Sequence, residues 1–291
     1  MTEHTDDLQL EISESRDDVI TVVLTADNHL GHAAFGQQAR KREELQQRLR
    51  RAFEQATDFA IEQGVDFFVQ AGDWFDTTTP DERDRNFVAA RLAQLKQHGV
   101  QVVALGGVRD TPSDVNALLG ETTPAPQQSY ARLGALHYFS PVQRDPAQLL
   151  EPLQLSIRGI EVALCGLGVV AGQEGDPLAR VRVSDDVNQA ALSVLLLHAP
   201  IEGLADGSRL LDTRAQVRHE TLERQMDFEY ILAGYHHSFA HLRIGKSELV
   251  VAGATQYVDV SPQDHVPGFV YLGLAADGLR WRRHISVEAL T

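Results

Sequence analysis

The stretch VVLTADNHLGH, residues 22–32, is the most informative segment of the sequence. An apolar run from Val22 to Leu24 leads into Asp27 and His29, which are two residues apart. Side chains two residues apart in an extended chain point to the same side, so we expect this carboxylate and imidazole to project together from the end of a strand. Such a pair can hold a divalent cation, cap the next helix, or have no special role.

The segments that follow alternate between strand and helix. Apolar residues in 40–63 have the spacing of an amphipathic helix, and Gly64 is a natural end for it. We predict strands at 19–25, 66–70 and 100–105, and helices at 40–63 and 80–97. This order predicts parallel strands joined by right-handed crossovers.

The remainder of the chain has shorter apolar segments. We predict a loop at 120–129 and short strands at 137–139, 153–157, 161–164, 192–197, 230–233, 242–244, 249–252 and 269–274. Residues 1–18 are predicted to be an acidic arm, and residues 19–291 to form one layered α/β domain with two sheets.

Composition restricts the class of protein. Hydrophobic residues make up 43% of the 291, which is ample for a large core, and no stretch has the length needed to span a bilayer. Cys165 is the only cysteine, and the acidic N-terminus lacks the apolar segment of a signal peptide, so a cytoplasmic location is expected. The net charge of −15 argues against wrapping of nucleic acid by a basic surface, but not against an acidic site that holds metal ions.

Charged or imidazole side chains follow five of the predicted strands. They are Asp27 and His29, Asp73 and Asp76, Arg109 and Asp110, His198, and His236 with His237. Each alone is typical of a helix cap or a hydrogen-bonded polar residue. Together they favour one ligand site, because ligands bind at the carboxyl ends of strands in open α/β sheets. Oxygen and imidazole ligands without thiolate suit manganese, iron or zinc.

The order of these motifs resembles the calcineurin-like metallophosphoesterases. The sequence has D-x-H at 27–29, G-D-x-x-D at 72–76, a histidine after a strand at 198, and GYHH at 234–237 where the family has G-H-x-H. The stretches ADNHLGH and GYHHSFAHLRIG are most similar to SbcD-like DNA-repair nucleases. The resemblance implies an αββα fold with two central mixed sheets flanked by helices, and two metals that share a carboxylate and activate water for attack on phosphorus.

The resemblance also implies roles for individual residues. It makes Asp27, His29 and His237 ligands of a first metal, Asp73 the bridge between two metals, and His198 a ligand of the second. Manganese is the expected ion, with iron or zinc as alternatives and one or two ions per chain. Asp76 is expected to support the ligands or to lie at the entry of a helix.

Two motifs depart from the family pattern. The third reads Gly107-Val108-Arg109-Asp110 where the family has G-N-H-D, so its catalytic positions fall on Arg109 and Asp110. The fifth has Tyr235 where the family has a histidine of the second metal. Both losses affect the second metal, which Tyr235 as phenolate or a displaced His236 could still bind. Arg109 cannot donate a proton to a leaving group, but it could pair with phosphate or with Asp27 or Asp73.

Two functional hypotheses follow from this mixture of retained and lost motifs. One is a phosphodiesterase, acting on DNA by family likeness, with one intact and one weakened metal site. The other is a catalytically impaired relative retained for binding metal, nucleic acid or protein. The resemblance implies a possible homodimer and a coiled-coil ATPase partner, although the chain has no clear C-terminal capping domain for the latter. No membrane association is expected.

Overall fold

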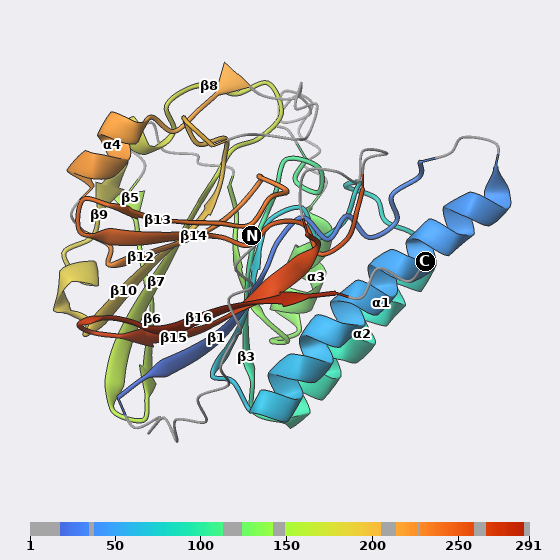
Figure 1. Ribbon diagram of the computed structural model, residues 1–291, viewed down its shortest axis with the longest axis horizontal. Helices are drawn as coiled ribbons and strands as arrows, with labels where there is room; N and C mark the ends of the chain where they lie inside the picture. The colour runs from blue at the N-terminus through green and yellow to red at the C-terminus, as the bar shows by residue number, and fades with distance from the viewer. Residues whose placement is uncertain are drawn as a thin grey trace, which may run out of the picture.

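The computed structural model describes residues 18–34, 38–112, 124–141, 149–204, 214–225, 227–258 and 266–287. The predicted arm at 1–18 lies outside these ranges except for Asp18. Within them, two six-stranded sheets form the centre of the molecule (Figure 1).

The first sheet contains the strand that leads into Asp27. Its strands are β1 (Ile20–Thr25), β2 (Phe67–Ala71), β3 (Gln101–Leu105), β4 (His137–Phe139), β15 (Gly268–Ala275) and β16 (Gly278–Ser286). They lie in the order β16-β15-β1-β2-β3-β4. Strands β1 to β4 are parallel, as the alternation of helix and strand predicts, whereas β15 and β16 are antiparallel additions.

The second sheet is also mixed. Its strands are β6 (Leu153–Ile157), β7 (Ile160–Gly168), β10 (Leu192–His198), β12 (Tyr230–Gly234), β13 (Ala240–Ile244) and β14 (Ser247–Val251), in the order β13-β14-β12-β10-β7-β6. The inner four strands are parallel, and β6 and β13 are antiparallel edges. Two small sheets pair β5 (Leu149–Leu150) with β9 (Arg182–Val183) and β8 (Glu174–Gly175) with β11 (Arg214–Ala215).

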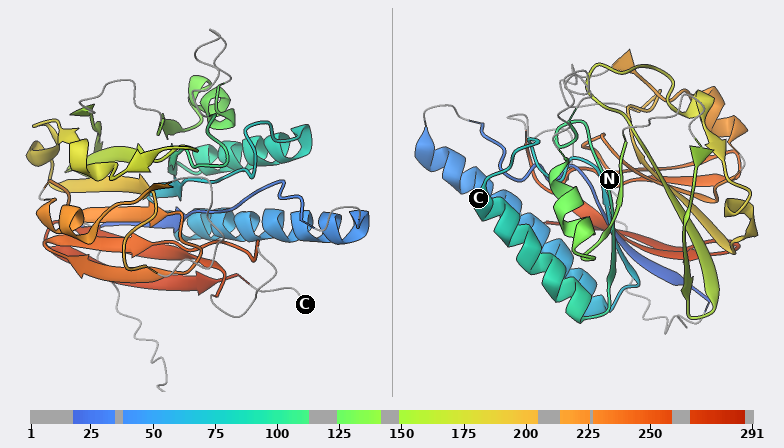
Figure 2. Two further views of the ribbon diagram at one scale, coloured as in Figure 1. Left: turned by 90° about the horizontal axis from the view of Figure 1, so that it is seen from above. Right: turned by 180° about the vertical axis from the view of Figure 1, so that it is seen from behind.

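Helices cover the outer faces of both sheets. The long helices α1 (Ala39–Gln63) and α2 (Glu82–Gln97) lie side by side over the first sheet, as both views in Figure 2 show. The short α3 (Pro126–Arg132) also packs there through Tyr130. The second sheet is covered by the shorter α4 (His219–Arg224), η2 (Leu178–Arg180) and η3 (Val187–Gln189). This confirms the expected αββα layers.

Alternate residues of each central strand face different apolar layers. Leu24 and Val69 pack between the two sheets, whereas Val23 and Phe68 pack against Phe53 of α1. Both faces of a strand are thus removed from water, which explains the continuous apolar runs in the sequence. Burial of one such side chain contributes about 1.5–3 kcal/mol, so the layers hold the strand ends in fixed positions.

Two sequence-based expectations are wrong in detail. The loop predicted at 120–129 contains the start of α3, with Pro126 at a helix start, where proline is favoured. The final strand β16 is missing from the prediction because arginines interrupt its apolar residues. It is an edge strand in which Trp281 is buried while its neighbours Arg280, Arg282 and Arg283 are not.

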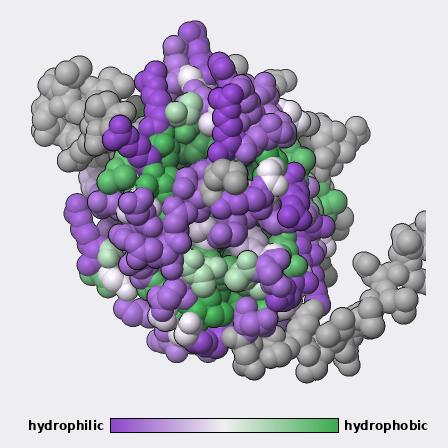
Figure 3. Space-filling model, turned by 90° about the vertical axis from the view of Figure 1, so that its left-hand side faces the viewer, coloured by the Kyte–Doolittle hydropathy of each residue, from purple (hydrophilic) through white to green (hydrophobic). Residues whose placement is uncertain are grey.

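The outer surface over α4 and the ends of the sheets is largely hydrophilic. Figure 3 shows this face, on which apolar residues gather in separate areas between hydrophilic ones. Among the described residues, no helix combines the length and apolar character needed to cross a membrane.

Candidate metal centre

Five of the side chains singled out by the sequence converge at the carboxyl ends of the strands. Asp27, His29 and His237 form one set of potential ligands, which we call the His29 group. Asp27, Asp73 and His198 form a second, the His198 group. Within each group the ligand atoms lie within 4.8 Å of one another, and all five side chains are buried.

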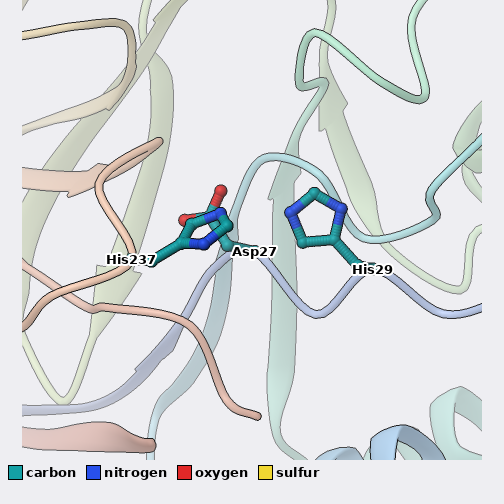
Figure 4. A group of neighbouring side chains, drawn as sticks. All are labelled: Asp27, His29 and His237. Carbon is teal, nitrogen blue, oxygen red and sulfur yellow. The ribbon is translucent and has the colours of Figure 1, made fainter. Parts of the chain in front are cut away.

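The two sheets both contribute to these groups. Asp27, His29 and Asp73 follow β1 and β2 of the first sheet, whereas His198 ends β10 and His237 follows β12 of the second. Figure 4 shows Asp27, His29 and His237 meeting at this edge. Asp27 belongs to both groups, while Asp73, the bridge by family resemblance, belongs only to the His198 group.

The backbone that carries three of these residues is strained. Asp27, His29 and Asp73 have φ values of +48°, +46° and +52°, in the left-handed region that residues other than glycine seldom adopt. Their loops are held together by hydrogen bonds from Asp27 N to Gly72 O (3.0 Å) and from His29 N to Asp73 O (3.1 Å). Such strain persists where the surrounding structure enforces it, and it is frequent at functional sites.

Three glycines allow the loops to approach one another. A Cβ atom on Gly72 would lie 2.0 Å from His198 Nδ1, and one on Gly107 would lie 2.1 Å from Asp73 Oδ1. A Cβ atom on Gly234 would lie 2.2 Å from Ala71 O. The glycines of the second, third and fifth motifs are therefore required by packing around the ligands.

Hydrogen bonds aim the free nitrogens of two histidines into the site. His198 donates from Nδ1 to Ala71 O (2.8 Å), which leaves Nε2 facing Asp73 Oδ2 at 3.5 Å. His29 donates from Nδ1 to Asp76 Oδ1 (2.9 Å). Neither Nε2 atom, nor Asp27 Oδ1, has a hydrogen-bond partner among the described residues. Buried polar atoms without partners are rare, and these three fit coordination of a cation.

Backbone amides hold the other carboxylate oxygens. Asp27 Oδ2 accepts from Tyr235 N (2.9 Å), and Asp73 Oδ1 accepts from Arg109 N (2.7 Å). These bonds leave one oxygen of each carboxylate toward the ligand groups. Each aspartate is therefore positioned by one oxygen and available through the other.

Asp110 lies under the site and is completely buried. One of its oxygens accepts from Gly107 N (2.8 Å), and the other accepts from Trp74 N (2.8 Å), Phe75 N (3.1 Å) and the Gln127 side chain. Asp110 thus ties the third motif to the loop that carries Asp73.

The metal-free site has strongly perturbed acidities. Burial raises the pKa of Asp27 to about 7 and that of Asp110 to about 6. Burial opposes protonation of His198, but the carboxylates of Asp73 and Asp27 outweigh it and raise the pKa of this imidazole to about 9. Such a cluster holds protons that a bound cation would displace.

Two positions beside the His198 group at which the resemblance implies polar ligands are occupied by apolar or aromatic side chains. Val108 and Tyr235 are both buried in the apolar cluster on the outer side of the second sheet. The Tyr235 ring lies edge-on to His198, with ring centroids 5.5 Å apart, and its φ is +81°. Arg109 is exposed.

His236 points to a different part of the molecule. Its Nε2 accepts a hydrogen bond from Ile201 N (2.9 Å) in the loop after β10, and it belongs to neither ligand group. A ring whose Nε2 accepts carries its proton on Nδ1, so this orientation offers no lone pair to a metal.

Sequence reasoning did not identify His32 or Gln70. His32 shares Asp76 with His29, and Gln70 hydrogen-bonds to both Asn28 and the backbone of Gly72. His32 is the second histidine of the HLGH stretch at residues 29–32, but its contact with Asp76 depends on the folded loop. Asp76 hydrogen-bonds to His29, one of the candidate ligands.

Comparison with known proteins identifies a family for most of the chain. The sequence model of calcineurin-like phosphoesterases matches residues 20–238. No curated protein matches the chain.

Several solved structures are similar at low identity. A dimetal phosphatase from Danio rerio is 15% identical with a TM-score of 0.47, and the match covers 93% of this chain and 100% of that one. An archaeal phosphodiesterase is 8% identical with a TM-score of 0.38, covering 92% and 100%. Zinc-complexed Vps29 from Entamoeba histolytica is 13% identical with a TM-score of 0.35, covering 92% and 98%.

Proposed function

Because the chain belongs to the calcineurin-like phosphoesterase family, we propose that it is a metal-dependent phosphodiesterase. The observation that carries this proposal is a set of buried atoms in the two adjoining ligand groups, for which the described part of the chain provides no hydrogen-bond partner: Asp27 Oδ1, His29 Nε2 and His198 Nε2. A divalent cation held there would supply Lewis-acid polarisation of a phosphate oxygen and would lower the pKa of a bound water molecule.

The chain's own residues have separate parts in this proposal. Asp27, His29 and His237 hold the firm site, and Asp73 with His198 contributes to a weaker one. Arg109 is exposed beside the Asp73 loop, where its guanidinium can pair with a substrate phosphate. Asp110 keeps the Arg109 loop in place through its backbone hydrogen bonds. Arg109 and Asp110 thus bind and position, and neither is assigned a proton transfer.

The weaker site follows from the apolar packing of Val108 and Tyr235. A valine cannot coordinate a cation, and the tyrosine ring packs among apolar residues. We therefore infer about one tightly held ion per chain, with manganese as the preferred metal. From the SbcD-like motifs we infer that the substrate is DNA. We also propose that the protein is cytoplasmic. A homodimer and a coiled-coil ATPase partner remain proposals from the resemblance alone.

A second candidate function is supported by the same substitutions. Loss of the third-motif asparagine and histidine removes groups that the family uses at the reacting phosphate. A protein that binds one metal ion but does not hydrolyse phosphodiesters would retain the fold for binding. The two candidate functions predict different rates of phosphodiester hydrolysis but the same number of bound metal ions.

Metal analysis and hydrolysis assays test both candidates. Protein stripped by chelator and dialysed against Mn²⁺ should retain about one ion per chain, and two tightly held ions would refute the one-site proposal. Hydrolysis of bis(p-nitrophenyl) phosphate and of single-stranded and duplex oligonucleotides should depend on Mn²⁺. Asp73→Asn should abolish it, whereas the exposed Asp58→Asn should not. Stoichiometric metal without hydrolysis of any of these substrates would favour the second candidate.

A further inference from the structure

Asp76 lies between two histidines, only one of which belongs to a ligand group. Its Oδ1 accepts from His29 Nδ1 and its Oδ2 accepts from His32 Nδ1, each at 2.9 Å. The His29 side chain is only 5% exposed, whereas those of Asp76 and His32 are 22% and 21% exposed. The row therefore runs from the ligand group toward solvent.

The inner hydrogen bond determines which nitrogen of His29 is free. A carboxylate can only accept, so the proton of the neutral ring is on Nδ1. The lone pair of Nε2 is then directed toward Asp27 and His237, and no described residue hydrogen-bonds to this atom. His29 is thus a ready nitrogen donor only while Asp76 keeps its orientation.

The outer hydrogen bond restrains Asp76 itself. Asp76 is partly exposed, and without His32 its second oxygen would face water and the carboxylate could rotate. His32 is in turn fixed by its backbone N–H, which donates to His29 O at 3.0 Å. The turn from residue 29 to residue 32 therefore brings both imidazoles onto one carboxylate.

We propose that His32 is a positioning residue of the metal centre, which acts through Asp76 to fix the ring orientation and tautomer of His29. This inference rests on the metal site of the proposed function, but not on catalysis. The contrasting view is that His32 and Asp76 form an ordinary surface ion pair. Such pairs contribute little to stability, and this one would then have no effect on the metal site.

Two variants of His32 separate these views. His32→Phe keeps a ring but removes the donor, whereas His32→Asn keeps an N–H near the position of Nδ1. Removal of such supporting groups weakens metal binding by about 10–100-fold, so we expect His32→Phe to lower Mn²⁺ affinity by about tenfold and Asp76→Asn by at least as much. His32→Asn should retain most of the wild-type Mn²⁺ affinity. His219→Phe is the matched control, because His219 pairs with Glu223 in α4, outside the ligand groups.

The metal-free protein provides a readout that does not depend on metal or activity. In ¹⁵N spectra at alkaline pH, His29 should show one protonated and one unprotonated nitrogen. His32→Phe should shift these signals toward a mixture of tautomers, while His32→Asn should preserve them. Circular dichroism would establish that each variant is folded, and His32→Asn remains informative if His32→Phe is not.

Each outcome has a defined meaning. Unchanged Mn²⁺ affinity together with unchanged His29 signals in His32→Phe would overturn the proposal. Wild-type protein that binds Mn²⁺ without hydrolysing phosphodiesters would refute the proposed function and leave this inference standing. If the wild type bound no Mn²⁺, the tautomer comparison alone would decide for or against the role of His32.

Discussion

Removal of metal should make stability fall as pH rises, chiefly through His198. In the metal-free protein burial opposes protonation of this imidazole, but Asp73 and Asp27 outweigh it and raise its pKa from 6.5 to about 9. Between these values the folded protein binds more protons than the unfolded chain, so the free energy of unfolding decreases with rising pH. A change in pKa from 6.5 to about 9 corresponds to about 3 kcal/mol in the free energy of unfolding. This stabilisation is fully present below pH 6.5 and is lost as the pH rises through about 9.

Asp27 acts in the same direction at lower pH. Burial raises its pKa from 3.8 to about 7, so its carboxyl group also binds a proton more readily in the folded protein. Its ionisation therefore destabilises the metal-free protein as pH rises from 3.8 to about 7. A bound cation would replace these protons and remove the dependence.

Thermal unfolding in the presence of chelator provides the assay. For a protein of this size, about 3 kcal/mol corresponds to a decrease in Tm of about 5 °C between pH 6.5 and pH 9. An asparagine at position 198 does not titrate, so His198→Asn should lose most of that decrease, and excess Mn²⁺ should suppress the decrease in the wild type. A metal-free Tm that stays constant or rises over this range, or that falls equally in His198→Asn, would refute the reasoning.

Two further changes test the packing of the site. Gly72→Ala should lower stability by more than the roughly 1–3 kcal/mol of backbone strain and should reduce metal content, because its Cβ would meet the His198 ring. Gly203→Ala, at φ +84° compared with +96° for Gly72 and with open space around it, should show the strain alone. Equal unfolding midpoints in urea for the two variants would contradict the packing argument. The combined change Val108→Asn, Arg109→His and Tyr235→His should raise Mn²⁺-dependent hydrolysis of bis(p-nitrophenyl) phosphate and add a second ion. An unchanged rate and ion count would show that these three positions do not limit the second site.

The central strands were predictable from sequence because both of their faces are buried. β1, β2 and β10 each contain an unbroken apolar stretch (VVL, FFV and VLLL), so their positions are evident from the sequence without knowledge of the fold. β16 was not, because an edge strand needs only alternate apolar residues and its exposed arginines interrupt the pattern. The start of α3 is not predicted for a related reason, since a short helix beside a proline-containing loop has little helical periodicity of apolar residues.

The candidate ligands were predictable in identity but not in arrangement. Their order along the chain indicated Asp27 and His198, but not that Asp27 would belong to both groups. The positive φ angles of Asp27, His29 and Asp73 could not be predicted from the sequence. Aspartate and histidine adopt negative φ in most proteins, so their presence alone does not indicate a left-handed backbone. The contact between His32 and Asp76 likewise depends on the folded turn, because the two residues are 44 positions apart in the sequence.

The contribution of both sheets to the ligand groups has a mechanical consequence. Asp27 and His29 extend from one layer of the sandwich, and His237 extends from the other. An ion held by all three would cross-link the layers at their shared edge, so separating the sheets would require releasing it. The rate at which the sandwich opens should therefore be limited by ion dissociation, and a chelator should shorten the lifetime of the folded protein as well as remove its metal.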